Sequence, residues 1–325
     1  MITIQKCVDR EEWDDYVLEA GGHPLQLWGW GQVKSGHGWT ADRFLLVDDE
    51  EPDTFLGGAQ VLTRRLPFPL KAFSYIPRGP VGERSNELLD LIATNVKREY
   101  KSVALSVEPE TVNFVAPVGW EKGSNSVLPA ATIALDLKKS ESDLLANMAK
   151  KTRQYIRKSA AEQTQIRQVR TKAELEGVLK IYKQTAKRAK FNLHNDQYYY
   201  DVFNAMADNT LIYATYEDET PIAFLWLAIS ASTAFELYGG VNERGQELRA
   251  NYALKWNAIR KTKEWGLSTY DFGGLISGGV SVFKQGWTNE ETHLAGTFDK
   301  PLSKLYGLWS KGLPTAKKIV RKIKR

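Results

Sequence analysis

The sequence predicts a mixed α/β protein made of two tandem copies of one unit, and three observations support this prediction. The chain has 325 residues, which is typical of two domains rather than one. Asp48–Ala59 aligns without gaps with Glu217–Ala228, and six of the aligned residues are identical. In both halves this hairpin segment is followed by a strand, a long helix and another strand, as expected of a duplicated unit.

The first half begins with a strand and a helix that Asp9 can cap. Leu25–Trp39 follows, and its three tryptophans and four glycines are unusual in a plain helix. It lacks the strand and the third glycine of a dinucleotide-binding turn, which excludes that function. The strands expected here are Ile2–Cys7, Phe44–Asp48, Thr54–Arg64, Lys71–Val81 (broken by two prolines) and Val103–Glu108, with a helix over Glu83–Tyr100.

The second half repeats this order, and two of its helices begin with capping signals at Ser140 and Thr171. Its expected strands are Ala131–Leu137, Ile166–Arg170, Leu211–Tyr216, Ile222–Ile229, Ala234–Val241 and Thr269–Phe272. Its expected helices run from Ser140 to Ala160, from Thr171 to near Lys187, over about Asp196–Asp208 and over Leu248–Trp265. The order matches the GCN5-related acetyltransferase (GNAT) fold. We expect one GNAT-like domain over residues 1–138, with 302–325 packing on it, and a second over 139–301.

Composition excludes several classes of protein. Hydrophobic residues make up 42% and charged residues 26% of the chain, both ordinary values for a globular protein. No apolar run approaches the ~18 residues of a membrane span, and the N-terminus has no signal-peptide pattern. Cys7 is the single cysteine, and the four histidines lack zinc-binding spacing. We expect a cytoplasmic monomer with Cys7 buried and with no metal or other cofactor.

Positive charge is concentrated in two places, although the net charge is only +5. Six of the nine residues Lys317–Arg325 are basic. The second cluster lies on one predicted helix and consists of Lys150, Lys151, Arg153, Arg157 and Lys158. Such clusters suit RNA, nucleotide diphosphates or a peripheral contact with anionic lipid, and they are equally compatible with a solvated helix face and a frayed tail.

Thr269–Trp287 is the stretch most suggestive of chemistry. A short strand is followed by two glycine pairs, where the backbone can take positive φ or approach a ligand closely. Lys284 then stands in a run of apolar and small residues. It is either a positive charge directed at a ligand or an incidental lysine on a surface loop. Gly274 and Gly279 have P-loop spacing, but Val-Ser follows where Lys-Ser/Thr is required, which excludes a Walker A loop.

The segment before the last long helix limits the choice of acyl donor. An enzyme of this fold that uses acyl-CoA needs a glycine-rich turn there, whose N–H groups hold the pyrophosphate. Asn242–Trp256 instead carries the bulky Leu248, Arg249 and Tyr252. The donor is therefore expected to be an activated acyl group other than a CoA thioester, and aminoacyl-tRNA is the natural alternative.

Several motifs together resemble the Fem-type (FemXAB) peptidoglycan bridge-forming aminoacyltransferases. They occur here in the order LWGWGQVKSGHGW, YIPRGPV, KKTRQYIRKSA, NYALKWNAIRKTKEWG, YDFGG and FKQGW. The resemblance implies tandem GNAT-like domains that transfer an amino acid from aminoacyl-tRNA to the stem-peptide amine of UDP-MurNAc-pentapeptide or lipid II, which builds the interpeptide bridge. The shorter family members, without a coiled-coil arm, are most similar.

The resemblance also assigns residues. Lys34 would meet the precursor's diphosphate with Arg188 as its partner, and Lys284 would lie at the acyl-transfer centre. Tyr252 would line the substrate site and Glu108 would lie near the peptide. The substrate-binding set also includes Phe283. The positive charge of the C-terminal stretch, rather than the resemblance, predicts contacts with tRNA phosphates at Lys317, Lys318, Arg321 and Lys322. The chain departs from the family's FKxxFG pattern after Lys284, where it reads QGWT.

The expected chemistry is simple. Attack of an amine on a tRNA ester is thermodynamically favourable, so the protein needs to supply positioning and charge stabilisation. Lys284 could stabilise the oxyanion or the leaving oxygen. No protein base is evident. Two alternatives remain open at this point: a CoA-dependent N-acyltransferase of a small molecule, and a non-catalytic RNA- or lipid-binding module.

Overall fold

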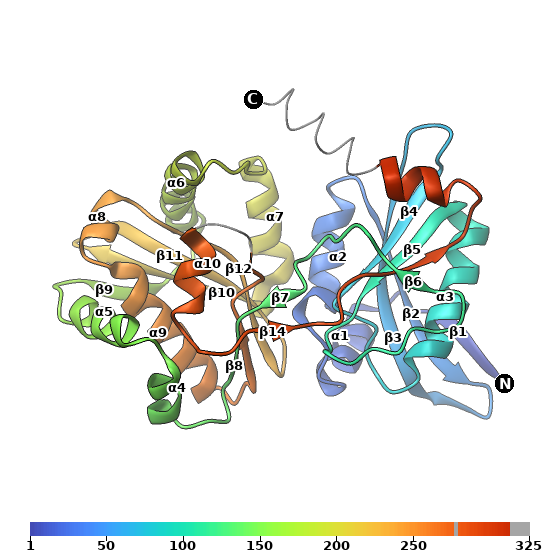
Figure 1. The fold of residues 1–325 in the computed structure, drawn as a ribbon, viewed down its shortest axis with the longest axis horizontal. Coiled ribbons are helices and arrows are strands. Elements are labelled where there is room, and N and C mark those ends of the chain that lie inside the picture. The colour runs from blue at the N-terminus through green and yellow to red at the C-terminus, as the bar shows by residue number, and fades with distance from the viewer. Residues whose placement is uncertain (276–278, 313–325) are drawn as a thin grey trace. The chain divides into compact units, whose positions relative to one another are not determined.

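The computed structural model describes residues 1–275 and 279–312 (Figure 1). The chain forms two compact units. The first unit comprises Met1–Ala130 together with the chain from His293 onward, and the second unit comprises Ala131–Thr292. These boundaries lie eight and nine residues before the expected ones at 138 and 301. Among the described helices, none combines the length and apolar character needed to cross a membrane.

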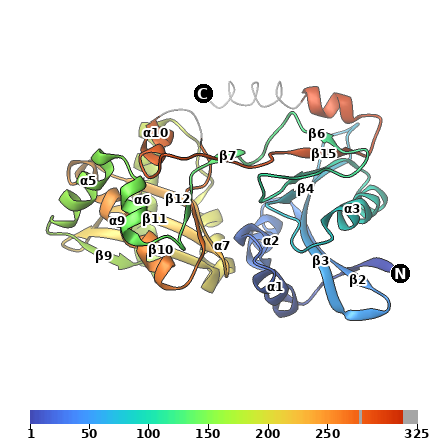
Figure 2. The same cartoon turned by 60° about the horizontal axis from the view of Figure 1, so that its bottom comes forward.

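The first unit is a mixed sheet with helices on both faces (Figures 1 and 2). Its strands lie in the order β1-β2-β3-β4-β5-β15-β6, and only the neighbours β4 and β5 run parallel. Its strands are β1 (Ile2–Lys6), β2 (Thr40–Asp48), β3 (Glu51–Arg65), β4 (Ala72–Pro77), β5 (Ser102–Glu108), β6 (Glu121–Lys122) and β15 (Phe298–Pro301). Its helices are α1 (Arg10–Glu19), η1 (Pro24–Gln26), α2 (Trp28–Ser35) and α3 (Ser85–Tyr100), and residues 306–312 are also helical.

The second unit has a sheet in the order β8-β13-β12-β11-β10-β9. Its strands are β8 (Ala134–Asp136), β9 (Gln165–Gln168), β10 (Thr210–Glu217), β11 (Thr220–Ile229), β12 (Thr233–Val241) and β13 (Thr269–Asp271). Its helices are α4 (Glu141–Asn147), α5 (Lys150–Ala160), α6 (Lys172–Ala189), α7 (Asp196–Met206), η2 (Ala207–Asn209), α8 (Glu243–Glu247), α9 (Ala250–Glu264) and α10 (Gly279–Gln285). The short strands β7 (Ala131–Thr132) and β14 (Thr292–His293) lie where the chain passes between the units.

The predicted duplication is confirmed by the pairing of the strands. β1 to β5 and β9 to β13 follow the same sequence of antiparallel neighbours, and each series ends in a parallel pair. In both sheets the next strand, β15 or β8, runs antiparallel to the last one. The aligned segments at Asp48–Ala59 and Glu217–Ala228 form the turns of equivalent hairpins, β2–β3 and β10–β11.

Alternation of side chains along the strands produces cores on both faces of each sheet. Phe44 and Leu46 of β2 pack with the apolar face of α3, whereas Leu45 between them packs with Trp13 of α1. Cys7 joins this second cluster and is buried, as predicted. The second unit builds one core cluster from the strands and from α4, α5 and α9. A helix must bury its apolar stripe, so the amphipathic α3 determines where the first core forms.

Two predicted helices are each interrupted by an extended or left-handed residue. The helix expected from Ser140 to Ala160 is two helices, because Met148 and Ala149 are extended and the Ala149 N–H donates to the Gly286 carbonyl at 3.0 Å. The helix expected over Leu248–Trp265 is preceded by α8 and begins after Arg249, whose φ is +55°. The capping box at Thr171 is present as predicted.

The glycines of α2 explain its unusual composition. Gly31 faces β2 and β3, and a Cβ there would lie 2.1 Å from Gln60 Oε1 and 2.5 Å from an Arg43 guanidinium nitrogen. Gln60 cannot move away easily, because it is fully buried and donates to the Leu25 and Leu27 carbonyls. Glycine therefore allows α2 to pack close to the sheet.

We expect Gly31→Ala to lower the free energy of unfolding by about 1–3 kcal/mol, because the added methyl group overpacks this contact. Urea unfolding followed by circular dichroism measures the change. Gly36→Ala is the matched control, since the nearest atom to a Cβ there is 3.5 Å away. Equal midpoints for both variants would show that Gln60 and Arg43 yield without cost.

Candidate functional site

A cavity of about 500 Å³ lies within the second unit. Its walls come from β11, β12, α6 and α9, from the loop after β13, and from α10. Most of the lining is apolar or aromatic, and its charged members are Glu236, Lys255 and Lys284. An apolar cavity with a few convergent charged groups is the usual form of a small-molecule binding site.

The cavity exists because two parallel strands part early. β12 pairs with β13 only from Thr233 to Phe235, and β13 ends at Asp271, while β12 continues to Val241. The chain leaves β13 through Gly273, whose φ is +76° and whose absent Cβ would lie 2.4 Å from the Glu236 carbonyl oxygen. Only glycine fits this close approach, and the turn directs the loop along the cavity instead of along β12.

Lys284 reaches the cavity from α10. Its ammonium group donates to the carbonyl oxygens of Phe272 and Gly274, at 2.5 and 2.8 Å. Burial lowers the pKa of Lys284, while the negative charges of Glu236 and Asp271 act in the opposite direction. The ammonium is thus positioned by neutral carbonyl oxygens at the wall of the cavity.

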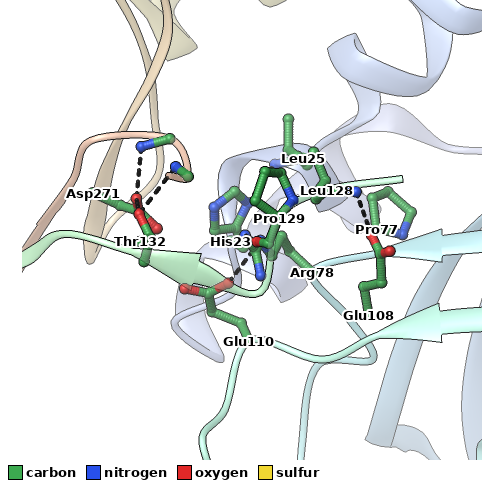
Figure 3. A network of polar contacts seen from close by, with 12 residues as sticks. His23, Leu25, Pro77, Arg78, Glu108, Glu110, Leu128, Pro129, Thr132 and Asp271 are labelled. Atoms are coloured by element: carbon green, nitrogen blue, oxygen red, sulfur yellow. Dashed lines mark hydrogen bonds and ion pairs between the residues drawn. The ribbon is translucent and has the colours of Figure 1, made fainter. Parts of the chain in front are cut away.

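A polar contact holds the loop that supplies these carbonyl oxygens. Asp271 Oδ1 accepts hydrogen bonds from the Thr132 hydroxyl at 2.5 Å and from the Gly273 N–H at 2.7 Å (Figure 3). The Thr132 hydroxyl oxygen accepts from the Gly274 N–H at 3.0 Å. The fully buried Asp271 therefore fixes the backbone on which Lys284 rests.

The sequence did not predict the second lysine of the site. Lys255 of α9 is buried and forms an ion pair with Glu236 of β12, and the Tyr270 hydroxyl donates to the same carboxylate at 2.8 Å. The Lys255 ammonium lies 4.4 Å from the centre of the Phe272 ring. Burial lowers the pKa of Lys255 to about 8, although the charge of Glu236 acts to raise it. A signal was present in the sequence, since Lys255 occupies the apolar face of its helix beside Leu254, Ala258 and Ile259.

The remaining predicted residues of the second unit differ in their surroundings. Phe283 lines the cavity beside Lys284. Tyr252 packs behind it, with ring centres 5.1 Å apart, and also stacks on Trp287. Tyr252 therefore supports α10 from the core. Arg188 is exposed in the last turn of α6 and donates to the Val241 carbonyl at 2.9 Å.

Lys34 and Glu108, the two predicted residues of the first unit, also differ in their surroundings. Lys34 is half-buried on α2, and its ammonium lies 4.2 Å from the centre of the Trp30 ring. Glu108 is buried at the end of β5, where its carboxylate accepts hydrogen bonds from Tyr75, from Thr297 at 2.8 Å, and from the Val127 and Leu128 N–H groups at 2.7 and 3.0 Å. Figure 3 shows the contact with Leu128. These donors belong to its own unit, so the carboxylate stabilises the loops around β5.

Beside Glu108 lies a buried arginine that sequence reasoning missed. Arg78 follows β4 with a φ of +50°, and its guanidinium pairs with Glu110 at 3.1 Å and donates to the Pro129 carbonyl at 3.2 Å (Figure 3). Burial and the charge of Arg78 together lower the pKa of His23, which favours its neutral form. The predicted tRNA contacts Lys317, Lys318, Arg321 and Lys322 lie outside the described residues.

Comparisons with known proteins fit this fold. Residues 146–285 match the family described as "Acetyltransferase (GNAT) domain". The lipid II:glycine glycyltransferase of Staphylococcus aureus is 22% identical over 423 aligned residues, covering 98% of this chain and 99% of the relative. The crystal structure of FemX superposes with a TM-score of 0.81 at 18% identity, over 94% of this chain and 99% of FemX. A tandem GNAT protein from the clavulanic acid biosynthesis pathway superposes with a TM-score of 0.54 at 9% identity, over 93% and 99% of the two chains.

The repeated sheet order and these matches define the class: the protein is a transferase with two tandem GNAT-like units. Sequence similarity along almost the whole of both chains, together with the superposition on FemX, supports a relationship to the Fem-type family.

The buried lysine generates a prediction about pH. The pKa of Lys255 is about 8 in the folded chain and ~10.4 in an unfolded one, so between these values the unfolded state binds more protons. This residue should therefore make the folded state more stable as pH rises from 8 to 10. Relative to the Lys255→Met/Glu236→Gln double variant, we expect the unmodified chain to gain on the order of 1–3 kcal/mol over that interval.

Urea titrations of both proteins at several pH values measure this difference, because groups that do not interact with Lys255 or Glu236 titrate alike in the two proteins. A difference that stays constant, or that falls as pH rises, would show that Lys255 titrates normally in the folded chain.

Proposed function

We propose that this protein transfers an amino acid from aminoacyl-tRNA to the stem-peptide amine of a peptidoglycan precursor, either UDP-MurNAc-pentapeptide or lipid II. The observation that carries the proposal is the placement of Lys284 at the wall of the cavity, on a chain similar along its whole length to an enzyme named a lipid II:glycine glycyltransferase. The transferred residue would become part of the interpeptide bridge.

The geometry of Lys284 fits charge stabilisation. An ammonium group has three N–H donors, and two of those of Lys284 are used by the carbonyl oxygens of Phe272 and Gly274. The third would meet the oxygen that becomes negative when the acceptor amine attacks the ester carbonyl. Since the two carbonyl contacts already orient the ammonium, little reorganisation is needed as charge develops. The ribose oxygen leaves with a proton, and the attacking amine loses one.

The choice of donor is supported by the start of α9. A CoA pyrophosphate would need free N–H groups on a glycine-rich turn at this place. Here α8 and the left-handed Arg249 precede the helix, and the Tyr252 N–H donates to the Arg249 carbonyl at 2.9 Å. This arrangement favours an acyl ester other than a CoA thioester, as the sequence predicts.

The direct test supplies radiolabelled aminoacyl-tRNAs, or acyl-CoA, together with either precursor. Transfer from one or more charged tRNAs to the precursor peptide is the expected result. Transfer from acyl-CoA alone, with every charged tRNA inactive, would replace the proposal by a CoA-dependent N-acyltransferase. Salt dependence of the apparent tRNA constant, with and without residues 317–325, tests the proposed contact of the basic tail with tRNA phosphates.

We expect Lys284→Met to lower the transfer rate by about two to three orders of magnitude, the usual loss for one donor to an oxyanion. Precursor binding should stay near that of the unmodified chain. Lys261→Met is the matched control, since Lys261 lies on the exposed side of α9 and pairs with Glu264 at 2.7 Å. Lys263 is less suitable, because its ammonium donates to the Leu137 carbonyl at 2.6 Å. Full activity of Lys284→Met would remove this lysine from the mechanism.

We also propose that Lys34 and Arg188 bind the diphosphate of the precursor. A charge-assisted contact contributes about 1.5–3 kcal/mol, so Lys34→Ala and Arg188→Ala should each weaken precursor binding roughly tenfold or more. Binding of aminoacyl-tRNA should change little. Calorimetry with UDP-MurNAc-pentapeptide measures this effect, with the exposed Lys97→Ala of α3 as control. Unchanged affinity in both variants would refute the assignment.

A further inference from the structure

The turn between β3 and β4 presents an aromatic side chain to solvent among cations. The Leu66 N–H donates to the Lys71 carbonyl at 3.0 Å and closes the turn. At its tip Phe68 is 88% exposed, between Pro67 and Pro69. The charged side chains of this turn and of the strand end before it are Arg64, Arg65 and Lys71, all of them exposed.

The turn and helix over residues 303–312 present a similar face. One side of this segment is fixed to the first unit: the Tyr306 hydroxyl donates to Asp299 at 2.9 Å, and the Ser310 carbonyl accepts from the Asn125 side chain at 2.8 Å. The side chains left exposed recur at helical spacing, with Leu308 (58% exposed) between cations. The exposed positions are Lys304, Gly307, Leu308 and Lys311.

One contact brings the two segments together. Phe73 of β4 pairs across the hairpin with Arg64, and its ring centre lies 4.9 Å from that of Trp309. The C-terminal helix therefore packs beside the base of the β3–β4 turn, as the red helix near β4 shows (Figure 1). We call the combined surface of residues 64–71 and the exposed face of 304–311 the basic-apolar surface.

All charged residues of the basic-apolar surface are positive. The sequence contains no Asp or Glu from Thr54 to Gly82, and none after Asp299. The packing of Trp309 on Phe73 joins these two acid-free stretches. Cations surrounding exposed apolar side chains are the composition of a peripheral membrane contact: the apolar groups enter the headgroup boundary, and the cations are attracted to anionic lipids.

A lipid surface fits these observations better than a nucleic acid does. RNA phosphates would attract the same cations, and an exposed aromatic ring could stack on a base. Leu308, however, has no ring, and an aliphatic side chain in the middle of a cationic face gains free energy by leaving water rather than by stacking.

We propose that the basic-apolar surface binds anionic membranes, with Phe68 and Leu308 inserted at the headgroup level. The inference comes from the first unit alone and does not depend on the transfer reaction. If the proposed function holds, the surface would also bring the enzyme to the place where a lipid-linked acceptor resides.

The test is cosedimentation of the full chain with vesicles of phosphatidylcholine alone or mixed with phosphatidylglycerol. We expect clear binding to the mixed vesicles and little to phosphatidylcholine. Phe68→Ser and Leu308→Ser should each weaken binding roughly fivefold or more, because each removes apolar area that insertion buries. Added salt should weaken binding further. The basic tail is present in every variant, so differences between variants report on this surface.

Val8→Ser is the matched control, since Val8 is 78% exposed but lies beside the acidic Asp9. Vesicle binding that is equal in the unmodified chain, Phe68→Ser and Leu308→Ser would overturn the proposal. The proposal would also be overturned if these variants lost binding to an RNA homopolymer but kept vesicle binding. That result would assign the surface to nucleic acid. Transfer to the soluble UDP-linked precursor without vesicles should be unchanged in Phe68→Ser, so failure of the transferase proposal is detected separately.

Discussion

The early separation of β12 and β13 is the constraint on which the site depends. Where the two parallel strands stop pairing after Phe235, one edge of β12 is left without a strand, and the chain turns away through Gly273. The early end of strand pairing and the turn at Gly273 open the cavity. They also direct the carbonyl groups of Phe272 and Gly274 toward Lys284. In the first unit the corresponding pair, β4 and β5, stays together as far as Pro77 and Glu108. Glu108 is then held by four donors, so the two copies of the unit have diverged at the same place in the fold.

A buried ion pair sets the electrostatics of the cavity. Removing Lys255 and Glu236 from water is costly, and their mutual attraction offsets that cost only because both are tightly paired and Tyr270 adds a hydrogen bond. The pair also has a chemical consequence. With the carboxylate of Glu236 paired to Lys255, the direct hydrogen-bond partners of the Lys284 ammonium at the cavity wall are the neutral carbonyl oxygens of Phe272 and Gly274.

The chain passes between the two units twice, after Ala130 and after Thr292. β8 follows β5 in the sequence but pairs with β13 of the second unit, and β15 follows β13 but pairs with β5 of the first. In the sequence, β8 of the second sheet follows the parallel pair β4 and β5 of the first sheet. Likewise, β15 of the first sheet follows the parallel pair β12 and β13 of the second. This exchange explains why the first unit needs the chain beyond His293, and it anchors the segment that carries Leu308 and Trp309.

Much of this protein follows from local sequence patterns. The alternation in the strands, the repeat at Asp48–Ala59 and Glu217–Ala228, and the capping box at Thr171 depend on neighbours in the chain, and they predicted the duplicated α/β order. The resemblance of short motifs identified Phe283 and Lys284, which the structure places in one cavity. Tertiary structure decided the rest, because the deciding contacts join distant segments. The helix break at Ala149 depends on the Gly286 carbonyl, the pairing of Lys255 depends on a strand nineteen residues away, and the carbonyl groups that hold Lys284 depend on where β13 stops. Periodicity and propensity report interactions within a few residues, so they carry no information about which distant groups packing will bring together.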